Sequence, residues 1–272
     1  MLSPNSRDET GAQRLAALDK PRFCGRRTFR SSDLLGGGEM ELAPNNIYVL
    51  VLMLAPIAGA VLILIGKVLP LGYSLLPSFL VWSVGTVYGL FKTCPTEGGP
   101  VSMFYVFGGW AEPFGIVLEL NRISWAAAGL GFLIGLVLWL HTRGREAYGS
   151  SFYLVLYLVF FSLHGVLFSR DLFNLFVWFE LLSLCSFVLV AYDHSPRALM
   201  AALRYLFLST VSIIFFLLGI WIFYRHGGSP SFSQVQGFLE GLSTASPRSL
   251  QASLAIVFIT AGIITRSAVL PF

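Results

Sequence analysis

The sequence predicts an all-α integral membrane protein with about seven transmembrane helices. Of its 272 residues, 56% are hydrophobic and only 12% are charged, whereas soluble domains carry about 25% charged residues. The mean hydropathy is +0.74, and the apolar residues gather in separate segments that are each long enough to cross a bilayer. These observations exclude a soluble domain with a single membrane anchor.

Seven segments have the length and hydropathy expected of membrane-spanning helices. They are residues 47–65, 71–91, 125–141, 152–168, 172–191, 200–224 and 250–270. Each is too uniformly apolar to be a surface helix with one polar face. Because hydrocarbon offers no water, such segments satisfy their backbone hydrogen bonds by forming helices.

The first 39 residues differ in composition from the rest of the chain. They are polar and rich in arginine and serine, and they lack the apolar core of a signal peptide. We expect residues 1–39 to be a disordered basic leader or an untranslated stretch, with translation beginning at Met40. The antiporter-like membrane domain argued below then occupies residues 40–272. Nothing after Met40 supports nucleic-acid binding by the basic residues.

Two of the connections between spans are predicted to have structure of their own. Residues 103–107 and 116–120 are strand-like, and the stretch between them is rich in turn residues. This pattern predicts a small β-hairpin on one membrane face, in the loop after the second helix. Residues 232–242 follow a break at Gly227-Gly-Ser-Pro230 and are predicted to form a short interfacial helix.

Glu180 is the strongest functional candidate, because it lies near the middle of the fifth span. At about 1.5 Å per residue, the helix carries it roughly half-way through a hydrocarbon core of about 30 Å. An ionisable group at that depth costs about 2.5 kcal/mol or more, and such groups mark proton and ion pathways. Burial raises the proton affinity of a carboxylate, and a nearby cation lowers it again. The alternative is a glutamate paired to a basic residue for packing alone.

Two arginines are candidate partners for this carboxylate. Arg266 lies well inside the apolar seventh span, and its head group either pairs with Glu180 across the bundle or snorkels to the membrane interface. Arg204 lies one turn into the sixth span and is either an intermediate charge or an interfacial anchor.

Asp171 and His164 are weaker candidates. Asp171 at the start of the fifth span suits a helix N-terminus, where a negative charge is favourable, and an ion entrance is the alternative. His164 lies deep in the fourth span and is a proton relay, a haem ligand or a hydrogen-bonded structural histidine. A haem held between helices normally needs two buried histidines, and the chain's other three lie at span ends: His141, His194 and His226.

No cofactor and no metal are expected. The three cysteines, Cys24, Cys94 and Cys185, lack the short spacing of a metal knuckle or a disulfide framework. The sequence also contains no phosphate-binding P-loop and no serine triad. The chain by itself therefore offers no redox centre.

At this point three motifs resemble a known family. Asp171-Leu-Phe-Asn-Leu-Phe-Val-Trp-Phe-Glu180 resembles the glutamate-bearing fifth helix of the proton-translocating antiporter-like membrane subunits. That family covers the large membrane subunits of respiratory complex I, related membrane-bound hydrogenases and Mrp-type sodium/proton antiporters. Ala202-Leu-Arg-Tyr-Leu-Phe-Leu-Ser209 resembles its sixth-helix Leu-Lys-Tyr motif. Ala261-Gly-Ile-Ile-Thr-Arg-Ser-Ala-Val-Leu-Pro-Phe272 resembles its seventh helix, and the match extends over residues 40–272.

The resemblance implies the first half of an antiporter-like inverted-repeat fold, in which Glu180 and Arg266 form the proton-translocation pair. It implies multi-pass residence in the cell (inner) membrane, with other membrane subunits of a respiratory or antiporter complex as partners and protons, with or without sodium, as the ions. If the complex is respiratory, the chain takes part in NADH–quinone oxidoreduction without holding a cofactor itself. Which of the three kinds of complex it belongs to stays open.

The chain departs from the family pattern at two points. The family's lysines are Arg204 and Arg266 here, and a buried lysine shifts its pKa readily whereas an arginine stays protonated. Arg266 can therefore tune Glu180 electrostatically but is a poor proton carrier. The sequence also stops where the family continues through a second repeat, so we expect a fragment or a half-subunit. The alternative function is a non-pumping structural subunit or a degenerate fragment.

Overall fold

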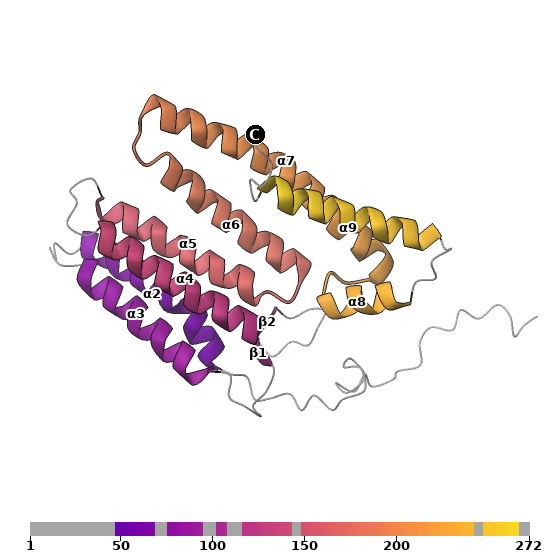
Figure 1. Cartoon of the computed structure of the whole chain (residues 1–272), viewed down its shortest axis with the longest axis horizontal. Helices are drawn as coiled ribbons and strands as arrows, with labels where there is room; N and C mark the ends of the chain where they lie inside the picture. Colours follow the sequence, from indigo (N-terminus) through magenta and orange to yellow (C-terminus); the bar gives the residue numbers. More distant parts are fainter. Residues whose placement is uncertain are drawn as a thin grey trace, which may run out of the picture. The chain divides into compact units, whose positions relative to one another are not determined.

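The computed structural model describes residues 47–68, 75–94, 102–107, 116–142, 148–241 and 247–266. These residues form eight helices and one two-stranded sheet (Figure 1). The helices are α2 (Ile47–Val68), α3 (Leu75–Lys92), α4 (Arg122–Thr142), α5 (Ser150–Phe168), α6 (Leu172–Val190), α7 (Pro196–Gly227), α8 (Phe232–Glu240) and α9 (Pro247–Arg266). The leader predicted at residues 1–39 and the alternative start at Met40 lie outside the described residues.

Six of the described helices are long and apolar enough to cross a membrane, namely α2, α4, α5, α6, α7 and α9. The predicted helical, multi-pass membrane fold is therefore confirmed. α3 coincides with the second of the seven predicted spans, but it has 18 residues and is not among the six. The first residues of that predicted span (71–91) and the last residues of the seventh (250–270) lie outside the described part of the chain.

The core of the N-terminal helices is aromatic. α2 packs against α3 and α5, and α4 packs against α5. Trp82 of α3 lies against Tyr157 and Phe160 of α5, with ring centroids 5.3 and 5.1 Å apart. Gly135 of α4 faces Trp82 and Phe160, where a side chain has no room. The missing side chain lets α4 approach this cluster closely, as small residues do between membrane helices.

The predicted hairpin is present as the antiparallel pair β1 (Ser102–Val106) and β2 (Val117–Asn121). Each strand is displaced by one residue from the prediction, and the predicted turn between them lies outside the described residues. β2 extends to Asn121 because its side chain caps α4, accepting a hydrogen bond from the Ser124 backbone N–H at 2.8 Å. The hairpin packs against α2, and β2 also against α4 and α5.

α7 and α9 form a closely packed pair. A Cβ atom on Gly219 of α7 would lie 2.5 Å from the side chain of Ile259 and 2.8 Å from the carbonyl oxygen of Ala255. Gly262 of α9 meets Ser212 in the same way, at 3.0 Å from its carbonyl oxygen. The two glycines thus permit a helix separation that larger residues would prevent.

The short helix predicted at residues 232–242 is present as α8. α7 ends at Gly228, whose φ of 76° lies in the left-handed region that glycine adopts without a steric cost. The ring of Phe238 in α8 then packs edge-on against Phe223 of α7, with centroids 6.5 Å apart.

Candidate functional site

Glu180 is the ninth of the 19 residues of α6, close to the middle of the helix. The helix begins at a defined residue, because the Asp171 side chain accepts hydrogen bonds from the backbone N–H groups of Phe173 and Asn174 at 2.8 and 2.9 Å. No proline or glycine interrupts the helix between this cap and Glu180. The cap therefore fixes the depth at which the carboxylate lies, and Asp171 has the helix-terminal position expected of it.

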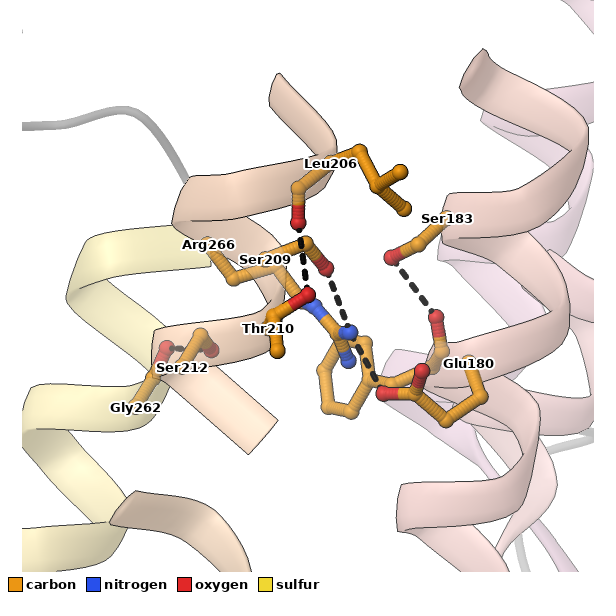
Figure 2. A network of polar contacts seen from close by, with 9 residues as sticks. Glu180, Ser183, Leu206, Ser209, Thr210, Ser212, Gly262 and Arg266 are labelled. Atoms are coloured by element: carbon orange, nitrogen blue, oxygen red, sulfur yellow. Dashed lines mark hydrogen bonds and ion pairs between the residues drawn. The ribbon is translucent and has the colours of Figure 1, made fainter. Parts of the chain in front are cut away.

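Arg266 is the last residue of α9 and lies directly against Glu180 (Figure 2). Its Nη2 donates a hydrogen bond to Glu180 Oε1 at 2.5 Å, although 86 residues separate the two in the sequence. Of the two alternatives for Arg266, pairing and snorkelling, the structure has the pair. A charge-assisted hydrogen bond of this kind is about twice as strong as a neutral one.

The same guanidinium has two further neighbours. Its Nη2 also donates to the hydroxyl of Ser209 on α7 at 2.8 Å, and its carbon atom Cζ lies 5.8 Å from the ring centroid of Phe179 on α6. Its Nε is buried and has no hydrogen-bond partner among the described residues. A single nitrogen of Arg266 thus binds Glu180 on one helix and Ser209 on another.

The helix that carries Arg266 is fixed to α7 one turn before the arginine. Ser212 Oγ donates a hydrogen bond to the carbonyl oxygen of Gly262 at 2.6 Å (Figure 2). Because Gly262 precedes Arg266 by four residues, this bond and the close packing at Gly262 hold the end of α9 against α7. Arg266 is therefore positioned by the α7–α9 pair, whereas Glu180 is positioned by α6.

The ion pair is only partly shielded by the described residues. The side chain of Glu180 is 27% exposed and that of Arg266 is 11% exposed. Only 17% of the residues of α6, and the same share of α9, are buried, against 28% to 44% in the other membrane-length helices. The carboxylate therefore faces the least covered part of the bundle, where a proton or water has access to it.

Ser209 was missed in the sequence, and a signal for it exists. Ser209, Ser212 and Gly219 recur at the spacing of one helix face, and this is the face of α7 that lies against α9. A stripe of small and hydroxyl-bearing residues in an apolar span indicates a helix-packing face. It does not by itself reveal which hydroxyl meets the arginine.

Arg204 is not brought to this pair by any hydrogen bond or ion pair in the described part of the chain. It lies in the third turn of α7 with an exposed side chain. Of its two alternatives, an interfacial anchor fits this exposure better than an intermediate charge in contact with Glu180.

His164 is completely enclosed in α5. Its ring stacks on Phe168 with centroids 5.6 Å apart, and it hydrogen-bonds the backbone of Leu52 on α2. Its Nδ1 has no partner among the described residues. Trp178, which packs onto α5 at Gly165, lies on the side of α6 opposite to Glu180, since two helical residues differ by about 200°. His164 therefore lies on the far side of α6 from the ion pair.

The described residues contain no group of three or more histidine, cysteine, aspartate or glutamate side chains that could hold a metal ion. Among them, His141 and His194 are exposed, so neither joins His164 as a second buried histidine. Within the described part of the chain, the arrangement at Glu180 and Arg266 offers proton and charge chemistry rather than metal ligation.

Comparisons with known proteins agree with this geometry. Residues 169–272 match a protein-family model described as "NADH:quinone oxidoreductase/Mrp antiporter, TM". This region contains Glu180, Arg204 and Arg266 but not His164.

Curated relatives share about a third of their residues with the chain. The antiporter subunit mnhD2 of Staphylococcus haemolyticus (strain JCSC1435) is 36% identical over 132 residues, which cover 47% of this chain and 26% of that protein. NADH-quinone oxidoreductase subunit N of Desulforudis audaxviator (strain MP104C) is 34% identical over 173 residues, with 61% and 33% covered. A probable K(+)/H(+) antiporter protein of Rhizobium meliloti (strain 1021) is 30% identical over 159 residues, with 58% and 30% covered. The chain thus spans about a quarter to a third of the length of these relatives.

Solved structures share the fold. The membrane-bound sulfane sulfur reductase, an archaeal respiratory membrane complex, superposes with a TM-score of 0.66 at 18% identity, covering 80% of this chain and 43% of the matched one. The Mrp complex from Dietzia sp. DQ12-45-1b gives a TM-score of 0.60 at 18% identity, with 80% and 40% covered. Motifs, helical membrane fold and matches together show that the chain resembles the proton-translocating antiporter-like membrane subunits of respiratory complex I and Mrp-type antiporters.

Proposed function

We propose that this chain translocates protons, alone or coupled to sodium, as an antiporter-like subunit of a multisubunit membrane complex, with Glu180 as the carboxylate that takes up and releases the proton. The observation that carries the proposal is the Glu180–Arg266 contact, which pairs opposite charges contributed by two membrane-length helices. Ionisable side chains at such positions mark ion pathways. The family match over residues 169–272 supports it independently.

Arg266 acts in this proposal by charge rather than by proton transfer. While Glu180 is deprotonated, the guanidinium stabilises its negative charge through the hydrogen bond from Nη2. When Glu180 accepts a proton, the pair loses its charge attraction, and Ser209 still accepts a hydrogen bond from the same nitrogen. The arginine keeps its own proton throughout. Movement of Arg266 toward or away from Glu180 therefore controls the proton affinity of the carboxylate.

The partners in this proposal are other membrane subunits, in a complex such as an NADH-quinone oxidoreductase or an Mrp-type cation/proton antiporter. The relatives bear names of both kinds, and the chain spans about a third or less of their length. The complex resides in the cell (inner) membrane. In a respiratory complex, the redox cofactors belong to other subunits.

Substituting Glu180→Gln tests the proposal. The amide keeps the size of the side chain but cannot ionise, so proton movement by the complex in liposomes, followed with a pH-sensitive dye, should be strongly reduced or abolished. Glu240→Gln is the matched control, because Glu240 is an exposed carboxylate on α8 that hydrogen-bonds only to Gln236 among the described residues. Unchanged pumping in Glu180→Gln would remove this residue from the mechanism.

A non-pumping structural subunit is the second candidate function, and the arginine at position 266 favours it. An arginine cannot release a proton in the way a lysine does, so the ion pair serves assembly in this alternative. The same substitution separates the two: near-normal proton movement together with reduced assembly of the complex in Glu180→Gln would support the structural role.

A further inference from the structure

The connection between α5 and α6, residues 169–171, lies between two other segments of the chain and is called the strap below. On one side, Ser169 forms an antiparallel bridge with Leu118 of β2. On the other side, Asp171 forms an antiparallel bridge with Ser231, which precedes α8. The strap thus adds backbone pairing to both the hairpin and the α7–α8 connection. Figure 1 shows β2, the start of α6 and α8 near the same end of the helices.

Two backbone hydrogen bonds join the strap to the α7–α8 connection. The N–H of Leu172, the first residue of α6, donates to the carbonyl oxygen of Pro230 at 3.0 Å. The N–H of Phe232, the first residue of α8, donates to the carbonyl oxygen of Arg170 at 3.1 Å. The starts of α6 and α8 are therefore tied to each other directly.

Side chains join the strap to the hairpin. Arg170 Nη1 lies 3.5 Å from Glu119 Oε2 on β2, and Ser102 Oγ on β1 donates to Glu119 Oε1 at 2.8 Å. The guanidinium of Arg170 also lies over the ring of Phe104 on β1, 4.8 Å from its centroid. The side chains of Arg170 and Glu119 are 18% and 26% exposed, so water only partly screens this ion pair.

These ties matter because little else holds Glu180 opposite Arg266. α9 packs on α7, and α6 packs on α5, whereas α6 and α9 make little backbone contact in the described part of the chain. α6 is joined to α7 covalently at its far end, beyond Val190. At its near end, the strap alone ties it by backbone hydrogen bonds to the segment that follows α7.

We infer that Arg170 and Glu119 are positioning residues for the Glu180–Arg266 pair. By anchoring the strap to the hairpin, they fix the start of α6 against the end of α7, and so set the separation between the helices that carry the two charges. The positional part of this inference stands by itself, and its consequence for transport rests on the proposed function.

The separation of α6 and α9 tests the inference directly. Spin labels on Leu184→Cys of α6 and Val257→Cys of α9, both exposed positions, report it in the membrane complex in liposomes, with Cys24 and Cys94 replaced by serine. Arg170→Gln and Glu119→Gln should each broaden the distance distribution. The charge reversal Glu119→Arg with Arg170→Glu should restore the narrow one, and Glu240→Gln on α8 should leave it unchanged.

Transport is the second readout. A misplacement of about 1 Å can cost up to roughly a hundred-fold in a positioned reaction, so proton movement per assembled complex should fall about tenfold in Arg170→Gln and recover in the charge reversal. A distance distribution that stays narrow in both single variants overturns the inference, as does a charge reversal that restores nothing. If Glu180→Gln leaves transport unchanged, the proposed function fails, while the distance measurement still decides the positioning role.

Discussion

At the Glu180–Arg266 contact, the two charges depend differently on pH. The carboxylate can gain or lose a proton in the physiological range once its surroundings raise its proton affinity, whereas the guanidinium stays charged. The proton in this pair can therefore reside only on Glu180. Arg266, hydrogen-bonded to Glu180 and to Ser209, acts as a fixed cation whose distance from the carboxylate sets how tightly the proton is held.

Removing the cation should harm both stability and transport. Arg266→Gln leaves Glu180 without its opposite charge; breaking a buried pair costs about 3–5 kcal/mol, and the partial exposure of Glu180 reduces this to about 1–3 kcal/mol. Arg266→Lys keeps the charge and should retain most of the transport. Thermal unfolding and proton movement of the purified complex measure the two effects. If the glutamine and lysine variants behave alike, charge is not what position 266 contributes.

The Ser209 hydroxyl should matter more than that of its neighbour in the chain. Ser209→Ala removes an acceptor for Arg266 and should cost about 1–2 kcal/mol, with a several-fold decrease in transport. Thr210→Val is the matched control, because the Thr210 hydroxyl donates only to Leu206 of its own helix and is exposed. Equal effects of the two substitutions on transport would contradict a specific role for Ser209.

At the scale of the helices, Arg266 is placed by the packing of α9 on α7. Gly219 and Gly262 supply the space for this packing, and the hydrogen bond from Ser212 to Gly262 fixes its register. Glu180 depends instead on the cap of α6 at Asp171 and on the strap. The pair is thus assembled from two separately positioned units.

Filling the α7–α9 contact should separate the helices. Gly219→Ala places a Cβ atom 2.5 Å from Ile259 and 2.8 Å from the Ala255 carbonyl oxygen, and overpacking of this kind costs about 1–3 kcal/mol. Gly237→Ala on α8 is the control, since nothing lies within 4 Å of its Cβ position and alanine favours a helix by up to about 1 kcal/mol. The melting temperature of the complex should fall in the first variant and stay level or rise in the second; a rise in both would show that the contact is not tight.

At the scale of the whole chain, the site lies where the described helices cover one another least. α6 and α9 have 17% of their residues buried, and their exposed positions are apolar, as at Leu184 and Val257. Apolar exposed faces are ordinary for membrane helices in lipid. A partly exposed ion pair between two such helices is more costly, which fits the proposed role in a larger membrane assembly.

Much of this fold was predictable, because hydropathy and length report membrane helices directly. The spans carrying His164, Glu180 and Arg204 agree with α5, α6 and α7 to within a few residues. The hairpin was displaced by one residue, since strand pairing and the cap by Asn121 set its ends rather than local composition. The second span is shorter in the described residues than predicted.

The sequence by itself determined that this is a helical membrane protein and that Glu180 lies near the middle of a span, because hydrophobicity and a 1.5 Å rise act locally along the chain. Only the tertiary structure decided which basic residue meets Glu180. Arg266 and Arg204 were both candidates, and the choice depends on glycine-mediated packing of α9 on α7. The same holds for Ser209 and for the Arg170–Glu119 pair, whose partners are 57 and 51 residues away and come together only when the helices pack.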